Sequence, residues 1–229
     1  MDAPSNLETV VSRRRPAPVK PHLLVEWYAE AHPGRAAELA TCLAANVANS
    51  ALAQIHVLGR PNDLAMVPSA PNLLKIPVDQ RMTFAAFIQY AGREIAGQPC
   101  VIANLDIQID EAAAVLLSVA DLRGHFLALC RWNILASDAL RFFNRNNSAD
   151  AWAFEAPLTI EGADFHLGKP GCDNRIAKLA DEAGLRVSNP SLSLVIRHLH
   201  LSGRRNYRVS ETVPDPYALV TPTRLRIEE

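Results

Sequence analysis

The sequence lacks any uninterrupted apolar run of the length, about 18 residues, that a membrane-spanning helix needs. It also lacks a surplus of charge, because 23 Lys and Arg are balanced by 24 Asp and Glu, which gives a formal net charge of -1. A balanced charge argues against generic nucleic-acid binding and against attachment to a membrane through a polybasic segment. We therefore expect neither a transmembrane segment nor a nucleic-acid partner.

Cysteine is scarce, with four in 229 residues, and no two of them have the Cys-x-x-Cys spacing of a structural zinc site. This usage predicts free thiols in a reducing compartment, and hence a cytoplasmic protein. The arginines at 13–15 are followed by prolines and not by an apolar stretch, so a secretory leader is not expected. Residues 1–21 are predicted to form a flexible arm.

The chain does contain enough apolar residues, 49%, to build the core of one domain. Short apolar runs alternate with segments of helical period, which is typical of an α/β domain with a mostly parallel sheet flanked by helices. We expect a single domain over 22–209 and an irregular tail over 210–229. The expected strands are 23–25, 53–58, 73–76, 100–103, 126–132, 151–154 and 192–200, the expected helices are 33–49, 83–95, 110–119 and 171–183, and the expected loops are 60–72 and 133–148, the second with a short helix.

Polar side chains follow one of the buried strands, where Asn104 and Asp106 come directly after residues 100–103. Ligands of such sheets bind outside the carboxyl ends of the strands, so this segment and Glu26 are expected at the binding edge. Alternate residues of an extended segment point the same way, and their oxygens suit Mg²⁺ or Mn²⁺. The alternative is an ordinary strand-to-helix turn capped by Asp110.

Two histidines, His198 and His200, are separated by a single residue near the end of the chain. On a strand they share one face, which suggests a metal ligand or a ligand with its support. The alternative is a purely structural role for both histidines. Arg204 and Arg205 follow closely and are suited to phosphate binding.

A third cluster lies where Gly171 precedes a predicted helix with Asp173 in its first turn. Asp173 can act as a helix cap or, at the mouth of a pocket, as a general base. Upstream, Asp150 is a second candidate base, and Trp152 is a candidate for stacking on a sugar face. The alternative is an acidic loop residue and a tryptophan of the core.

Taken in order, these stretches resemble GT-A-type, family 2-like glycosyltransferase-like proteins of bacteria over roughly residues 22–207. The matching blocks are Asn-Leu-Asp at 104–106, Arg-Trp at 131–132, Ser-x-Asp-x-Trp at 148–152, Gly-Cys-Asp-Asn-Arg-Ile-Ala at 171–177, Asn-Pro-Ser at 189–191 and His-x-His-x-Ser at 198–202.

The resemblance implies a GT-A-like fold and transfer of a sugar from a nucleotide-sugar donor to a saccharide or other hydroxyl acceptor, assisted by Mn²⁺ or Mg²⁺. It implies metal ligands in Asp106 and in His198 or His200, and a base in Asp173 or Asp150. Donor contacts are expected from Glu26, Arg81, Asn104, Asp106, Arg204 and Arg205, and acceptor contacts from Trp132, Trp152 and Asn174.

Three positions depart from the family pattern. The acidic motif begins with Asn104 where an Asp is usual, Cys172 stands where a Glu is expected, and Ala149 stands where a Gln is expected. A metal-dependent phosphoester hydrolase and a non-catalytic nucleotide- or sugar-binding domain remain alternatives, because both would use the same Asp and His residues.

Overall fold

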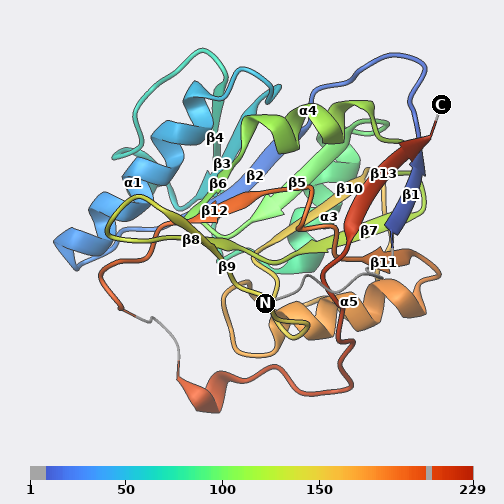
Figure 1. Ribbon diagram of the computed structural model, residues 1–229. Helices are drawn as coiled ribbons and strands as arrows, with labels where there is room; N and C mark the ends of the chain where they lie inside the picture. Colours follow the sequence, from blue (N-terminus) through green and yellow to red (C-terminus); the bar gives the residue numbers. More distant parts are fainter. Residues whose placement is uncertain (1–8, 205–207, 229) are drawn as a thin grey trace.

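A computed structural model describes residues 9–204 and 208–228 (Figure 1). A seven-stranded sheet in the order β11-β7-β10-β5-β2-β3-β4 forms its centre, and only β10 runs antiparallel to its two neighbours. The strands are β2 (His22–Trp27), β3 (Ile55–Gly59), β4 (Leu73–Pro77), β5 (Pro99–Ala103), β7 (His125–Leu129), β10 (Ala151–Glu155) and β11 (Arg186–Ser188). The mostly parallel α/β sheet expected from the sequence is confirmed, and β2 lies between β3 and β5.

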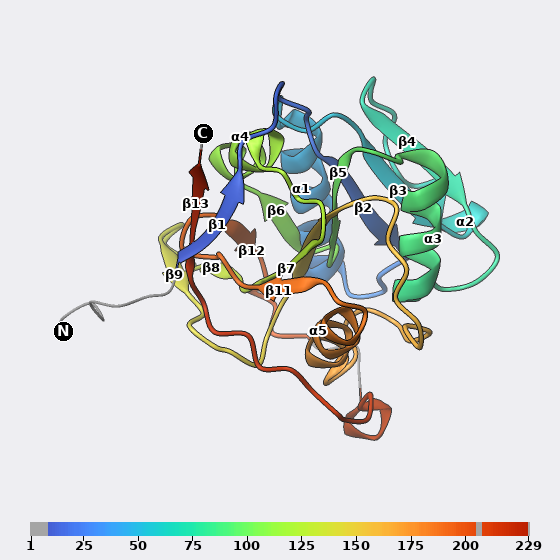
Figure 2. The same cartoon turned by 90° about the vertical axis from the view of Figure 1, so that its right-hand side faces the viewer.

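Helices cover both faces of the sheet (Figures 1 and 2). One face packs on α1 (Pro33–Ala48) and α4 (Glu111–Val119), and the other on α3 (Phe84–Glu94) and α5 (Cys172–Glu182). A short helix, α2 (Pro61–Leu64), interrupts the segment expected to be a loop, and a 3-10 turn, η1 (Val209–Glu211), lies near the end. No helix in the described ranges is long and apolar enough to cross a membrane.

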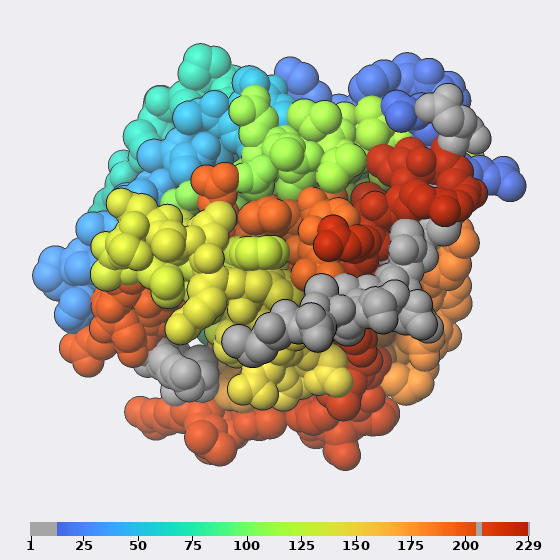
Figure 3. All heavy atoms as spheres, viewed as in Figure 1, coloured from blue at the N-terminus to red at the C-terminus, as the bar shows by residue number. Residues whose placement is uncertain are grey.

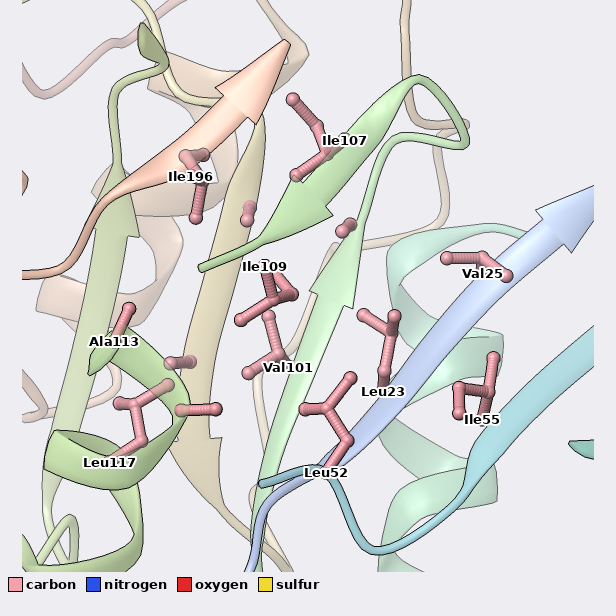
Figure 4. Packing of buried hydrophobic residues seen from close by; sticks show 14 of the residues in the cluster. Leu23, Val25, Leu52, Ile55, Val101, Ile107, Ile109, Ala113, Leu117 and Ile196 are labelled. Carbon is pink, nitrogen blue, oxygen red and sulfur yellow. The ribbon is translucent and has the colours of Figure 1, made fainter. Parts of the chain in front are cut away.

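Successive side chains of a strand point to opposite faces of the sheet, so each central strand contributes residues to the core on both faces. Leu23 of β2 and Val101 of β5 point to the side of Leu117 in α4 (Figure 4), whereas Leu24 packs with the aromatic residues of α3 on the other face. A strand covered on both faces must be apolar throughout, which explains the unbroken apolar runs of β5 and β7. The four cysteines are buried free thiols, as expected.

A second, four-stranded sheet in the order β6-β12-β8-β9 flanks the first. Two expectations are corrected here: residues 133–148 contain a β-hairpin where a short helix was predicted, and the predicted strand 192–200 is reduced to three residues. A turn causes the shortening, because Leu194 N donates to Pro190 O over 2.9 Å. The strands are β6 (Ile107–Ile109), β8 (Trp132–Ile134), β9 (Leu140–Phe142) and β12 (Ile196–His198).

Two segments near the chain ends, which the sequence predicted to be a flexible arm and an irregular tail, form a pair of strands. Strand β1 (Thr9–Arg13) lies parallel to β13 (Arg224–Glu228) in a sheet of two strands. Leu225 and Ile227 of β13 pack on the core cluster that includes α4, and Figure 3 shows the red strand against the green helix at the surface. The limits of a 22–209 domain remain a prediction, but the flanking segments are structured at these strands.

Candidate active site

A cleft of about 1210 Å³ opens at the edge of the sheet where β2 and β5 end. It lies at the place where parallel α/β sheets bind ligands. Ten residues singled out from the sequence line it, namely Glu26, Arg81, Asn104, Asp106, Asp150, Asp173, Asn174, His198, His200 and Arg204.

The antiparallel direction of β10 brings Asp150 to this edge. Ala151, the first residue of β10, pairs with Ala103, the last residue of β5, so the residues beyond them are neighbours. Asn104 Nδ2 donates to Asp150 Oδ1 over 3.2 Å, and Arg131, just past β7, donates through Nη1 to Asp150 Oδ2 over 2.9 Å. Both carboxylate oxygens of Asp150 are thus engaged by donors.

Asp106, His198 and His200 form a cluster of metal-ligand type. β12 pairs antiparallel with β6 so that His198 lies opposite Ile107, next to Asp106 in the chain. His198 Nε2 lies 3.1 Å and His200 Nδ1 3.9 Å from Asp106 Oδ2, and one ligand atom from each residue falls within 4.8 Å of the others. The three side chains are 10%, 11% and 19% exposed, respectively.

Two atoms of this cluster are buried without a hydrogen-bond partner among the described residues, Asp106 Oδ1 and His200 Nε2. Buried polar atoms are almost always paired in proteins, so each such atom calls for a ligand, a water or an ion. A carboxylate oxygen and an imidazole nitrogen that carries no hydrogen are ligands suited to a divalent cation, which matches the metal site expected from the sequence.

Arg35 in α1 is part of the site and was not anticipated. Its guanidinium pairs with the carboxylates of both Asp106 and Glu38, and Glu38 in turn accepts from the Ser202 amide over 2.6 Å. Burial alone would raise the pKa of Asp106, but the hydrogen bond and charge of His198 and the charge of Arg35 outweigh it and hold the pKa well below its usual range. Asp106 is therefore an anion at neutral pH.

Asp173 faces the same cleft from the start of α5. Gly171 caps this helix with a φ of 78°, and the Asp173 carboxylate accepts from the amides of Ala149 over 3.1 Å and of Asn174 over 3.0 Å. Burial, reinforced by the charge of Asp150, raises its pKa to about 6, although the amide hydrogen bonds act in the opposite direction. A carboxyl with this pKa is basic enough to accept a proton and still ionised at neutral pH.

Glu26 and Arg81 also line the cleft and pair with each other over 3.4 Å. Glu26 Oε1 accepts from the Met82 amide over 2.8 Å, and Arg81 Nη2 donates to Leu167 O over 2.9 Å. Burial raises the pKa of Glu26, partly offset by the Met82 amide and by Arg81. Both side chains keep polar atoms at the cleft surface.

The structure does not bring the two predicted tryptophans to the cleft. Trp152 is 0% exposed and packs edge-on against Phe84 in the core, with ring centroids 4.7 Å apart. Trp132 donates from Nε1 to Ser191 O over 3.0 Å and packs on Phe142. The assignment of Trp152 to acceptor stacking is wrong because β10 is a central strand, covered on both faces; Arg205 lies outside the described residues.

Residues that the sequence analysis missed include Arg35, Glu38 and Asn133. A signal was present for the first two, because they share the core-facing side of α1 with Leu39 and Cys42 at helical spacing. Charged side chains on an otherwise apolar helix face are expensive unless they are paired, which marks a buried polar site.

No protein-family profile and no curated protein sequence matches the chain. Among solved structures it is similar to a mannosyltransferase, PcManGT from Pyrobaculum calidifontis, in complex with GDP-Man and Mn²⁺. The TM-score is 0.54 at 14% identity, and the match covers 89% of this chain and 62% of that one, so the chain spans less than two thirds of that protein. The likeness establishes the fold, which is a glycosyltransferase-like α/β fold.

Proposed function

We infer that the chain is a glycosyltransferase that moves a sugar from a nucleotide-sugar donor to a hydroxyl acceptor with the help of a divalent ion. One observation carries this proposal: the Asp106–His198–His200 cluster and the raised-pKa carboxyl of Asp173 line one cleft. Glycosyl transfer uses both, a cation for the departing diphosphate and a base for the acceptor hydroxyl. The glycosyltransferase-like fold supports the same function.

The donor set at the cluster fits a divalent cation. Asp106 provides an ionised carboxylate with an unpartnered oxygen, and His200 provides an unpartnered ring nitrogen among the described residues. Two imidazoles beside one carboxylate favour a transition ion such as Mn²⁺ over Mg²⁺. When bound, the ion would supply positive charge to the diphosphate of the donor.

Arg204 and Arg81 would add charge to donor binding. Both side chains are exposed at the cleft, although Arg81 also pairs with Glu26 over 3.4 Å. Arg35 and Arg131 pair with Asp106 and Asp150 and are less exposed. Asn104, which donates to Asp150, lines the same cleft.

Asp173 would act as the base toward the acceptor. It lies where α5 begins, so the carboxylate is held by backbone amides and its position depends little on side-chain rotation. Asn174 lines the cleft beside it and is the remaining candidate for acceptor binding. Asp150 suits this role less well, because its carboxylate forms an ion pair with Arg131, whereas Asp173 is held by neutral backbone amides.

A thermal-shift screen of nucleotide sugars, with and without Mn²⁺, tests the proposal. A ligand present at a hundred times its Kd stabilises the native state by about 2.7 kcal/mol, which gives a measurable shift in Tm. We expect at least one nucleotide sugar to stabilise the protein more strongly with Mn²⁺ present. Asp106→Asn should remove the Mn²⁺-dependent part, and Asp138→Asn, a change in the β8–β9 turn, should leave it intact.

The products then separate the candidate functions. Release of a nucleoside diphosphate only when an acceptor is present indicates transfer. Release of phosphate or a nucleotide without any acceptor would indicate the phosphoester hydrolase, and binding without turnover the non-catalytic domain. If no nucleotide sugar raises the Tm of the protein, the proposal is contradicted.

A further inference from the structure

Asn133 lies next to the candidate cation site and belongs to no part of the function described so far. It is the middle residue of β8, which runs parallel to β12, and the register pairs Asn133 with His198. Its side-chain oxygen, Oδ1, is the acceptor for two groups, Arg131 Nε at 3.1 Å and His198 Nδ1 at 3.1 Å.

Arg131 determines which way the Asn133 amide points. A guanidinium has only donors, so the atom that faces it must be the amide oxygen and not the NH₂ group. Arg131 is itself anchored by Asp150 at 2.9 Å and by the ring of Phe143, whose centroid lies 4.1 Å from the guanidinium carbon. The orientation of the Asn133 oxygen is thereby fixed.

The proton on His198 follows from this orientation. Because Asn133 Oδ1 is an acceptor, the ring nitrogen that faces it, Nδ1, must carry a hydrogen. In the neutral ring the other nitrogen, Nε2, then has a free electron pair. That nitrogen lies 3.1 Å from the carboxylate oxygen Oδ2 of Asp106, which is also an acceptor.

The Arg35 guanidinium pairs with Asp106 Oδ2 and already supplies positive charge beside these two atoms. A divalent ion bound at Nε2 would take its electron pair and add positive charge at the same place. Asp106 Oδ1 and His200 Nε2 also lack a hydrogen-bond partner among the described residues. Asp106, His198 and His200 can each offer one ligand atom to a cation, and His198 does so through Nε2 only when its hydrogen is on Nδ1.

We propose that Asn133, held by Arg131, is a positioning residue that keeps the proton of His198 on Nδ1 and so presents Nε2 to a divalent ion. This inference rests on the cation site of the proposed function but not on sugar transfer. Arg131 is shared by Asn133 and Asp150, so one side chain links the surroundings of the cation site to Asp150.

The proposal can be tested without any substrate by measuring the binding of Mn²⁺ alone. The electron paramagnetic resonance signal of the free ion reports how much Mn²⁺ remains unbound. Asn133→Leu removes the acceptor while nearly keeping the shape, and should weaken Mn²⁺ binding about 10- to 100-fold, the range found when groups that orient metal ligands are lost. Asn133→Asp keeps an acceptor for both partners and should bind Mn²⁺ at least as tightly as the wild type. Arg141→Leu, at the residue paired with Asn133 on β9, is the matched control and should change little.

The ring itself gives a second readout. With diamagnetic Zn²⁺ bound, nitrogen NMR of the wild type and of Asn133→Asp should show His198 protonated at Nδ1 and metallated at Nε2, whereas Asn133→Leu should lose this uniform state. Wild-type protein that binds no Mn²⁺, an Asn133→Leu variant within about threefold of the wild type, or an Asn133→Asp variant as weak as Asn133→Leu would each overturn the proposal. Sugar transfer could fail while these results hold, so the two proposals are tested separately.

Discussion

The carboxyl of Asp173 shows how much a single side chain depends on its surroundings. Its place in the first turn of α5 would by itself favour the ionised form, yet burial and the nearby Asp150 raise its pKa to about 6. The sequence showed a helix-capping pattern and left the choice between cap and base open. The choice could not be made there, because burial by residues distant in the chain sets the pKa.

The raised pKa predicts the direction of the pH dependence. A general base works when it has lost its proton, so kcat/KM should rise as the pH increases through about 6 and level off above it. The measurement is the initial rate of transfer at subsaturating donor over the range from about pH 5 to about pH 8. A rate that falls over this interval, or an unchanged rising limb in Asp173→Asn, would exclude Asp173 as the base.

At the scale of elements, the start of α5 depends on Gly171. A side chain there would bring Cβ within 2.6 Å of Tyr217 Oη and 2.9 Å of Val213 O, in addition to the strain of a positive φ. Gly168 also has a positive φ, of 72°, but no described atom lies within 4 Å of the position that a Cβ would take there.

These two glycines form a matched pair for a stability measurement. Gly168→Ala should lower the free energy of unfolding by about 1–2 kcal/mol, the cost of the left-handed conformation alone. Gly171→Ala should cost about 1–3 kcal/mol more, because the added methyl group overpacks the helix start. Urea denaturation of both variants gives the comparison, and equal losses would show that the close approach at Gly171 has no energetic consequence.

Helices and strands whose apolar residues recur at a regular spacing were predictable from the sequence, and those without such a spacing were not. The helix at 33–48 has apolar residues at helical spacing, and β5 is an unbroken apolar run. The hairpin of β8 and β9 is partly exposed on both faces, so it carries no alternation of apolar and polar residues. β1 and β13 pair across almost the whole chain, and no local signal specifies such a partner.

The candidate site, like the fold, was predictable from the sequence where a local motif marks the residue. Asp106, His198 and Asp173 stand in recognisable local motifs, and the fold brings them to one cleft. Asn133 and Arg35 act through partners that only the folded chain provides. The strand that holds Trp152 was expected, but its burial in the centre of the sheet, which excludes a stacking role, depends on neighbouring strands that are distant in the chain.

At the scale of the whole molecule, a buried chain of hydrogen bonds ties the layers together on the side away from the cleft. His22 in β2 bonds to Gln98 and to His56 in β3, and His56 bonds to Tyr90 in α3. All donors and acceptors match when both imidazoles are neutral. Burial lowers the pKa of His22 and, together with the charge of His22, lowers that of His56 to about 4.

This network predicts acid lability with a defined sign. Both histidines have a lower pKa folded than unfolded, so the unfolded state binds more protons below about pH 6.5 and the free energy of unfolding falls as the pH drops toward 4. The slope per fully linked proton is about 1.4 kcal/mol per pH unit. Urea denaturation between about pH 7 and pH 5 measures it. His56→Gln, which removes one titrating group, should flatten the slope, and an unchanged slope would mean that other groups cause it.

The most direct test of the central claim is an assay of sugar transfer in which mass spectrometry detects the modified acceptor. The donor is the nucleotide sugar that stabilises the protein most, and the acceptors are a panel of hydroxyl compounds, with Mn²⁺ present. The account predicts an acceptor heavier by one sugar unit with the wild type, and a rate lower by about 10²-fold or more in Asp173→Asn with donor affinity unchanged, because the lost interaction belongs to the transition state. Donor breakdown at the same rate with and without acceptor, and no sugar on any acceptor, would contradict it.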